Sequence, residues 1–165
     1  MFKFIAYLKF LVKSTNAHGV HSPFVFNYVT QCLYSKKRFS RDKALNVLMN
    51  SIHYFQAEKV YLENNEAIKR KISNKFHQIN FEDSPRDVLF INQLDKLGFH
   101  ALLHERVFHN DSMILVNSIH ANQKKQQDWA ELTKLPEISV SIDMFYCGAI
   151  FIRKEQVKQH FTIRI

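Results

Sequence analysis

The chain has 165 residues, of which 46% are hydrophobic and 23% are charged, so we expect one globular domain with a sizeable core. Only three glycines are present, which argues against a glycine-rich loop around a phosphate or ribose. The formal charge of +8 suits anionic partners, but the lysines and arginines are scattered along the chain and give no strong nucleic-acid signal.

The first residues are apolar at helical spacing, which predicts a helix over 2–13. Lys3 and Lys9 interrupt this stretch, and it is too short and too charged to be a transmembrane segment. It also lacks the apolar region and cleavage site of a signal peptide. We expect the helix to pack on the domain, with an interfacial amphipathic helix as the alternative.

Two more helices complete a helical N-terminal cap over residues 1–56. Ser22 and Pro23 are typical of a helix start, and the apolar spacing continues to Tyr34. A third helix is predicted over 41–55. The aromatic residues expected to pack the cap on the rest of the chain are Phe4, Phe24, Phe26, Tyr28 and Phe55.

From Lys59 the pattern becomes that of an α/β domain over residues 57–165, forming one compact unit with the cap. Strands are predicted over 60–63, 77–81, 87–91, 113–116, 138–143 and 149–153, a strand-like tail over 161–165, and helices over 66–75, 97–106 and 123–134. Alternating strands and helices predict a mainly parallel, three-layer sheet. We expect 87–91 and 113–116 to be adjacent and central, and the last two strands to form an antiparallel pair.

Ligand sites of parallel sheets lie at the carboxyl ends of the strands. Here these ends carry Asn92 and, after the next strand, Asn117 and Ser118. Hard cations need anionic oxygens, so we predict no metal site. Ser118 and His120 lie two residues apart, but no Gly-x-Ser-x-Gly motif frames the serine, so a hydrolase is not indicated.

Other candidate residues are weaker. His18 and His21 flank a turn without an acidic or cysteine partner, and His100 and His104 have zinc-ligand spacing without the His-Glu-x-x-His order. We interpret both pairs as ordinary loop and helix residues.

The two cysteines, Cys32 and Cys147, lie in apolar contexts without Cys-x-x-Cys spacing. They are typical of small buried residues in a reducing compartment, which predicts a cytoplasmic protein.

Several segments together resemble a known family. The matching stretches are His18–Phe26, Tyr54–Gln56, Asp87–Ile91, Trp129, Ile142–Phe145, Gly148, Phe151–Gln156 and His160–Arg164. On these residues the chain resembles the class I S-adenosylmethionine-dependent methyltransferase-like proteins of Bacteroidetes. The resemblance covers both ends, and the middle is shorter by one or two β/α units. It implies a shortened Rossmann-like methyltransferase fold with C-terminal antiparallel strands.

The resemblance also indicates where a vestigial cofactor site would lie. The acidic position after the first strand falls on Leu62 or Glu63, and the glycine position on Asn64 or Asn65, so the loop has no glycine. The carboxylate for the ribose is missing with the deleted unit, unless Glu82 or Asp83 replaces it. The remaining strand-end positions are Asn92, Asn117 and Ser118, where the family has acidic residues. The cofactor-binding candidates are therefore Glu63, Asn64, Glu82, Asp83, Asn92 and Asn117, and no catalytic residue is assigned.

These substitutions predict a pseudoenzyme that has lost its S-adenosylmethionine site, has no cofactor, and has a binding or regulatory role with an unknown protein partner or as a homodimer. One alternative is an active S-adenosylmethionine-dependent enzyme, similar to O-methyltransferases, with a non-standard loop. Another is a basic module that binds nucleic acid. Thermal stabilisation by the cofactor distinguishes the first two, and a steep salt dependence identifies the third.

Overall fold

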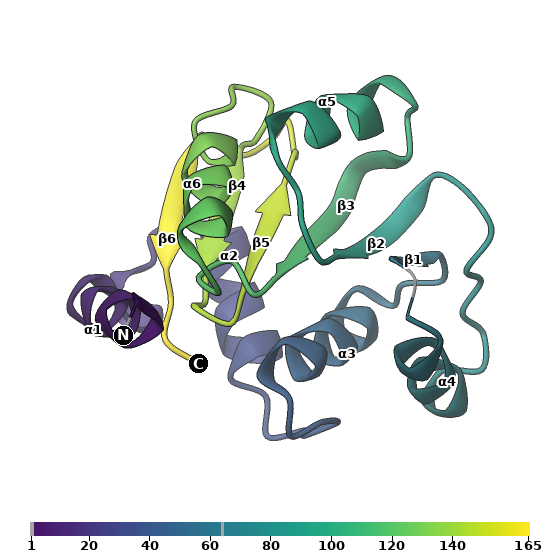
Figure 1. Cartoon of the computed structure of the whole chain (residues 1–165). Coiled ribbons are helices and arrows are strands. Elements are labelled where there is room, and N and C mark those ends of the chain that lie inside the picture. Colours follow the sequence, from purple (N-terminus) through teal and green to yellow (C-terminus); the bar gives the residue numbers. More distant parts are fainter. Residues whose placement is uncertain (1, 64) are drawn as a thin grey trace.

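The structure is a computed structural model and describes residues 2–63 and 65–165. Its helical segments are α1 (Phe2–Lys13), the 3₁₀ turn η1 (Ala17–Gly19), α2 (Pro23–Asn27), the π-helix η2 (Tyr28–Leu33), α3 (Lys43–Phe55), α4 (Glu66–Lys75), α5 (Lys96–His104) and α6 (Gln123–Leu132). Its strands are β1 (Val60–Leu62), β2 (Arg86–Ile91), β3 (Phe108–Asn117), β4 (Val140–Asp143), β5 (Cys147–Phe151) and β6 (Gln159–Thr162). Figure 1 shows helices on both faces of one twisted sheet.

The six strands form a mixed sheet in the order β1-β2-β3-β5-β4-β6. Strands β1, β2 and β3 are parallel, β5 is antiparallel to both β3 and β4, and β6 is parallel to β4. The prediction that β2 and β3 are adjacent and central is confirmed, as is the antiparallel pair at the end of the chain. Strand β5 therefore runs against all the others.

Alternating side chains of β3 divide the core into two layers, as the period of a strand requires. Met113 and Leu115 join the apolar cluster beneath α3, whereas Ile114 and Val116 join the cluster beneath α5 and α6. The three-layer arrangement is therefore confirmed. The first cluster also contains cap residues such as Leu48, so the cap and the sheet share one core.

Aromatic side chains fix the cap to the sheet. The fully buried ring of Tyr28 lies 5.6 Å from the ring of Phe151. The ring of Phe24 lies 5.1 Å from the same Phe151 ring. The Tyr28 hydroxyl is 2.8 Å from the hydroxyl of Ser51 on α3. The predicted packing was wrong for Phe4 and Phe26, which are 67% and 42% exposed.

The predicted strand over His77–Phe81 is also wrong. Only Asn80 makes a bridge there, to Lys59. The physical reason is a turn, because the side-chain oxygen of Asn80 accepts hydrogen bonds from the backbone N–H groups of Glu82 and Asp83. The chain therefore leaves the sheet before a ladder can form.

Other predicted boundaries moved by a few residues for local reasons. Helix α3 starts at Lys43 instead of Arg41 because the carboxylate of Asp42 caps it, accepting from the N–H of Leu45 at 2.8 Å. The tail pairs with β4 at Gln159–Thr162, earlier than predicted. Among the described residues, no helix is both long and apolar enough to cross a membrane.

Both cysteines are free and buried, as predicted. Burial raises the pKa of Cys32 to about 12, which opposes formation of the reactive thiolate.

Candidate functional site

The carboxyl ends of the parallel strands lie at one edge of the sheet, and their polar residues bind one another. The backbone N–H of Asn92 donates to the carboxylate of Glu63 at 2.7 Å. The side-chain amide of Asn117 donates to the side-chain oxygen of Asn92 at 3.2 Å. Three predicted site residues therefore come together, one at the carboxyl end of each of β1, β2 and β3.

Lys125 of α6 completes this cluster. Its ammonium group donates to the backbone carbonyl of Asn92 at 2.6 Å and to that of Asn117 at 3.4 Å. Burial lowers the pKa of Lys125, and the nearby carboxylate of Glu63 acts in the opposite direction. We call Glu63, Asn92, Asn117 and Lys125 the strand-end network. Several of its polar groups therefore already have protein partners.

The other predicted site residues lie elsewhere. Glu82 and Asp83 are on the loop that enters the amino end of β2, whereas Asn92 follows its carboxyl end. The carboxylate of Glu82 is 3.7 Å from the ammonium group of Lys69, and that of Asp83 accepts from the Asn80 amide. Asn64 lies outside the described residues. The structure therefore does not join Glu82 or Asp83 to the strand-end network.

A small pocket of about 150 Å³ adjoins the network. It lies between the end of β3, the β4–β5 turn, helix α1 and the start of α3. Its lining includes Lys3, Lys43, Ser118, His120 and Tyr146. We call this the His120 pocket.

His120 is the most constrained polar residue of the pocket. Its Nε2 is 2.7 Å from a carboxylate oxygen of Asp143, and both residues are buried. The other oxygen of Asp143 accepts from the backbone N–H of Phe145 at 2.8 Å, and the His120 ring stacks on the Phe145 ring at 5.1 Å. His120 Nδ1 is buried without a hydrogen-bond partner in the structure. A buried polar atom of this kind calls for a ligand or a water.

The backbone beside His120 has an unusual conformation. Ser118 and Phe145 have φ values of 55° and 66°, in the left-handed region that non-glycine residues rarely adopt. The backbone N–H of Ser118 donates to the carbonyl of Tyr146 at 2.8 Å, which holds the two turns together. Such conformations are frequent at functional sites.

Sequence reasoning treated His120 as an isolated histidine and missed Asp143. The two residues are 23 positions apart, and only the β3-β5-β4 strand order brings them together. Asp143 is the acidic residue in a stretch that alternates apolar residues with serines and ends β4, and that is the sequence signal that marks it.

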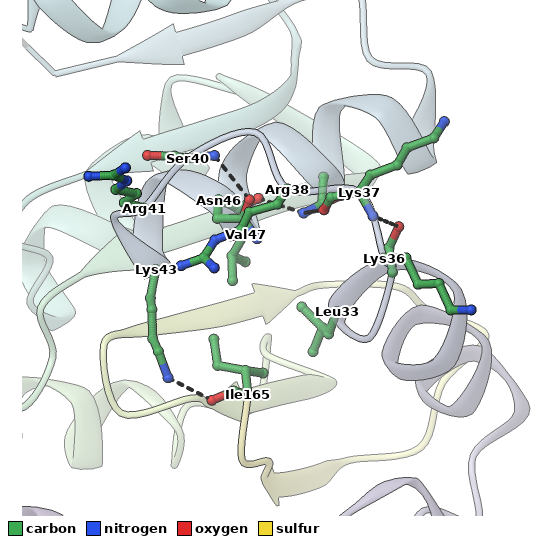
Figure 2. A pocket seen from close by; sticks show the side chains of 12 residues that line it. Leu33, Lys36, Lys37, Arg38, Ser40, Arg41, Lys43, Asn46, Val47 and Ile165 are labelled. Carbon is green, nitrogen blue, oxygen red and sulfur yellow. Dashed lines mark hydrogen bonds between the residues drawn. The ribbon is translucent and has the colours of Figure 1, made fainter.

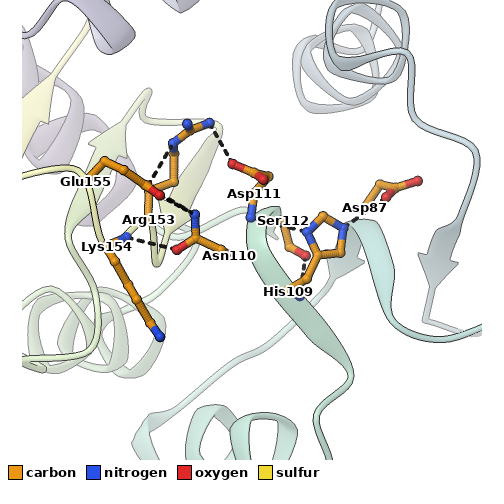
Figure 3. Close-up of polar contacts among 8 residues, drawn as sticks. All are labelled: Asp87, His109, Asn110, Asp111, Ser112, Arg153, Lys154 and Glu155. Carbon is orange, nitrogen blue, oxygen red and sulfur yellow. Dashed lines mark hydrogen bonds and ion pairs between the residues drawn. The ribbon is translucent and has the colours of Figure 1, made fainter.

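Figure 3 shows a separate polar cluster near the amino ends of β2 and β3. Asn110 donates to the carboxylate of Glu155 at 3.0 and 3.1 Å, and Arg153 pairs with Asp111 at 3.0 Å. These partly exposed pairs join the start of β3 to the segment after β5. Among the described residues, no group of three or more His, Cys, Asp or Glu side chains is placed to hold a metal ion.

A larger basic pocket of about 350 Å³ lies under the loop before α3. Its lining includes Lys36, Lys37, Arg38, Arg41 and Lys43. Figure 2 shows the Lys36 and Lys37 side chains extending away from the pocket, and the ammonium group of Lys37 lies 2.6 Å from Nε2 of His53. We therefore regard this loop as a charged surface and not as an anion site.

Comparisons of the chain with protein-family models, with curated proteins and with solved structures find no match.

Proposed function

We propose that this protein is a shortened Rossmann-like methyltransferase-like scaffold that does not bind S-adenosylmethionine and acts as a binding module. The strand-end network carries this proposal. It occupies the edge of the sheet where a nucleotide-like cofactor of such folds would lie.

The sheet topology supports the scaffold part of the proposal. Three parallel strands are followed by β5, which is inserted antiparallel between β3 and β4. This agrees with the C-terminal antiparallel strands that the resemblance implies. Strand β1 is an edge strand of the sheet. This agrees with the loss of one or two β/α units from the middle of the chain.

The chemistry of the network supports the loss of cofactor binding. A ligand at this edge would have to displace the ammonium group of Lys125 from the carbonyls of Asn92 and Asn117. It would also have to compete with the Asn92 N–H for the carboxylate of Glu63. Each such hydrogen bond contributes about 0.5–1.5 kcal/mol net, which the ligand would have to replace.

The His120 pocket favours a small anionic ligand for the binding module. Its volume of about 150 Å³ is below the roughly 300–1,000 Å³ of pockets that hold drug-sized ligands. Two lysines, Lys3 and Lys43, line it together with Asp42, whose carboxylate caps α3. The two ammonium groups outnumber this carboxylate, so they suit a small ligand with a carboxylate or phosphate group.

Thermal unfolding with added ligands tests the proposal. We expect no rise in melting temperature with S-adenosylmethionine or S-adenosylhomocysteine, and a rise with inorganic phosphate or acetate, because a ligand that binds only the folded state stabilises it. The rise should be lost in Lys3→Gln, which changes the pocket. It should persist in Lys9→Gln, which removes a charge from the same helix outside the pocket.

One observation favours the alternative of an active methyltransferase. His120 is hydrogen-bonded to Asp143, an arrangement that general bases use, and its buried Nδ1 could accept a proton from a substrate once the pocket opens. Stabilisation by S-adenosylmethionine that disappears in Glu63→Ala would support this alternative and reject the binding module.

A further inference from the structure

Helix α1 has two apolar faces, and only one of them packs on the protein. Ala6 and Phe10 are buried, and the ring of Phe10 lies 5.4 Å from that of Phe145. At about 100° per residue, Leu8 lies on the opposite side of the helix. An amphipathic helix that only covered its own domain would be polar on that side.

The outward face is strongly apolar. Phe4, Ile5, Leu8 and Val12 are 67%, 45%, 47% and 88% exposed. We call these four residues the α1 stripe. Exposed contiguous apolar surface of this kind is typical of protein or membrane interaction sites.

The charges around the α1 stripe indicate which kind of partner it binds. Lys9 and Lys13 lie on α1 beside the stripe, and the helix has no acidic residue. Residues 1–41 contain seven lysines and arginines and no aspartate or glutamate, so they hold +7 of the net charge of +8. A surface that combines an apolar stripe with positive charge suits a lipid bilayer, which is apolar inside and can carry anionic head groups outside.

The same charges disfavour the other occupants. A second copy docked through α1 would bring two segments of +7 together, and like charges repel. Nucleic acid would suit the lysines, but it offers phosphates and no apolar surface along the backbone for the stripe.

The basic loop before α3 extends the positive surface. Lys3 of α1 and Lys43 of α3 line the same pocket, and Lys43 also lines the basic pocket of the loop. Arg38 and Arg41 of this loop share another hollow with Lys71 and Lys75 of α4. Figure 1 shows α1 at the left of the molecule, the loop before α3 at the bottom and α4 at the lower right.

We propose that α1 docks the protein on the surface of bilayers that contain anionic lipids. The α1 stripe would enter the boundary between head groups and acyl chains, while Lys9 and Lys13 contact the anionic head groups. The helix has 12 residues and is about 18 Å long at 1.5 Å per residue, so it lies on the membrane and does not span it.

Vesicle co-sedimentation of the full chain tests this proposal. We expect binding to phosphatidylcholine vesicles with about 30% phosphatidylserine, and much weaker binding to phosphatidylcholine alone. Leu8→Ser combined with Val12→Ser should weaken binding more than about tenfold. The matched control is Leu97→Ser with Val157→Ser, which removes two residues that are 79% and 72% exposed elsewhere; it should leave binding within about twofold.

Variants that lack the α1 lysines test the electrostatic part of vesicle binding. Lys9→Gln with Lys13→Gln should weaken binding to the anionic vesicles by about 25-fold, or fivefold per lysine, and should not change binding to neutral vesicles. Circular dichroism confirms that each variant is folded.

Three outcomes would overturn the proposal. The first is no binding to the anionic vesicles by the folded wild-type chain. The second is a lipid-free dimer in sedimentation that Leu8→Ser with Val12→Ser dissociates, which would assign the stripe to a second copy. The third is RNA binding that is lost with the lysines and is unaffected by the stripe variants, without lipid binding.

Discussion

His120 and Asp143 join the turn after β3 to the end of β4 through a buried hydrogen bond of 2.7 Å. The bond lies on the ring whose Nδ1 is buried without a partner, so the pair both holds the two turns and orients the ring. Its removal should therefore affect both stability and ligand binding.

We expect Asp143→Ala to lower the free energy of unfolding by about 2–4 kcal/mol, because it leaves the buried His120 Nε2 and the Phe145 N–H without a partner. Urea unfolding measures this. Glu131→Ala is the control, since its exposed ion pair with Lys134 is screened by solvent and should contribute little to stability. Equal losses in the two variants would show that the buried pair has no special role.

Gly148 gives a test of packing across the sheet. A Cβ atom at this position would overlap the indole ring of the buried Trp129. We expect Gly148→Ala to lower the free energy of unfolding by about 3 kcal/mol, because neither the strand nor the indole can move freely. Gly98→Ala is the matched control. Its Cβ would lie 3.3 Å from the carboxylate of Asp95, a tight contact that a small shift of this side chain relieves. Helix propensity favours alanine there, so this variant should cost clearly less than Gly148→Ala, and the order of the two results should not reverse.

The carboxyl group of Asp87 should make part of the free energy of unfolding depend on pH. Burial acts to raise the pKa of its carboxyl group, but hydrogen bonds from the N–H groups of Lys59 and Glu58 and from His109 outweigh it, so the pKa is lowered. A lowered carboxyl pKa contributes stability that is present above the unfolded value of about 4 and is lost as pH falls through the folded value.

The difference in unfolding free energy between wild type and Asp87→Asn should therefore be largest near neutral pH and should shrink as pH falls from about 5 to about 3. Urea titrations across this range measure it. A difference that is constant with pH would contradict the role of the Asp87 charge.

Much of the fold follows from local sequence. Apolar periodicity predicted α1, α4 and the central strands, and Ser22 with Pro23 marked the start of α2. The false strand at His77–Phe81 shows the limit of such patterns, because one Asn80 side chain turned the chain away from the sheet.

The site was less predictable, because its contacts join distant parts of the chain. Asn92 and Asn117 were identified as strand ends, yet their link to Lys125 depends on how α6 packs over the sheet. Asp143 likewise reaches His120 only because β5 lies between β3 and β4. The exposed side of α1 depends on which face meets Phe145, which helical spacing alone does not decide.

Isothermal titration with S-adenosylhomocysteine tests the central claim, that the strand-end network has replaced the cofactor site. We predict no binding heat up to about 1 mM ligand, well above the micromolar range in which cofactor sites normally bind. The folded wild-type chain and Lys125→Ala, which opens the network, should both be silent, because the loop after β1 has no glycine. A dissociation constant in the low micromolar range for wild type, abolished by Glu63→Ala, would contradict the account.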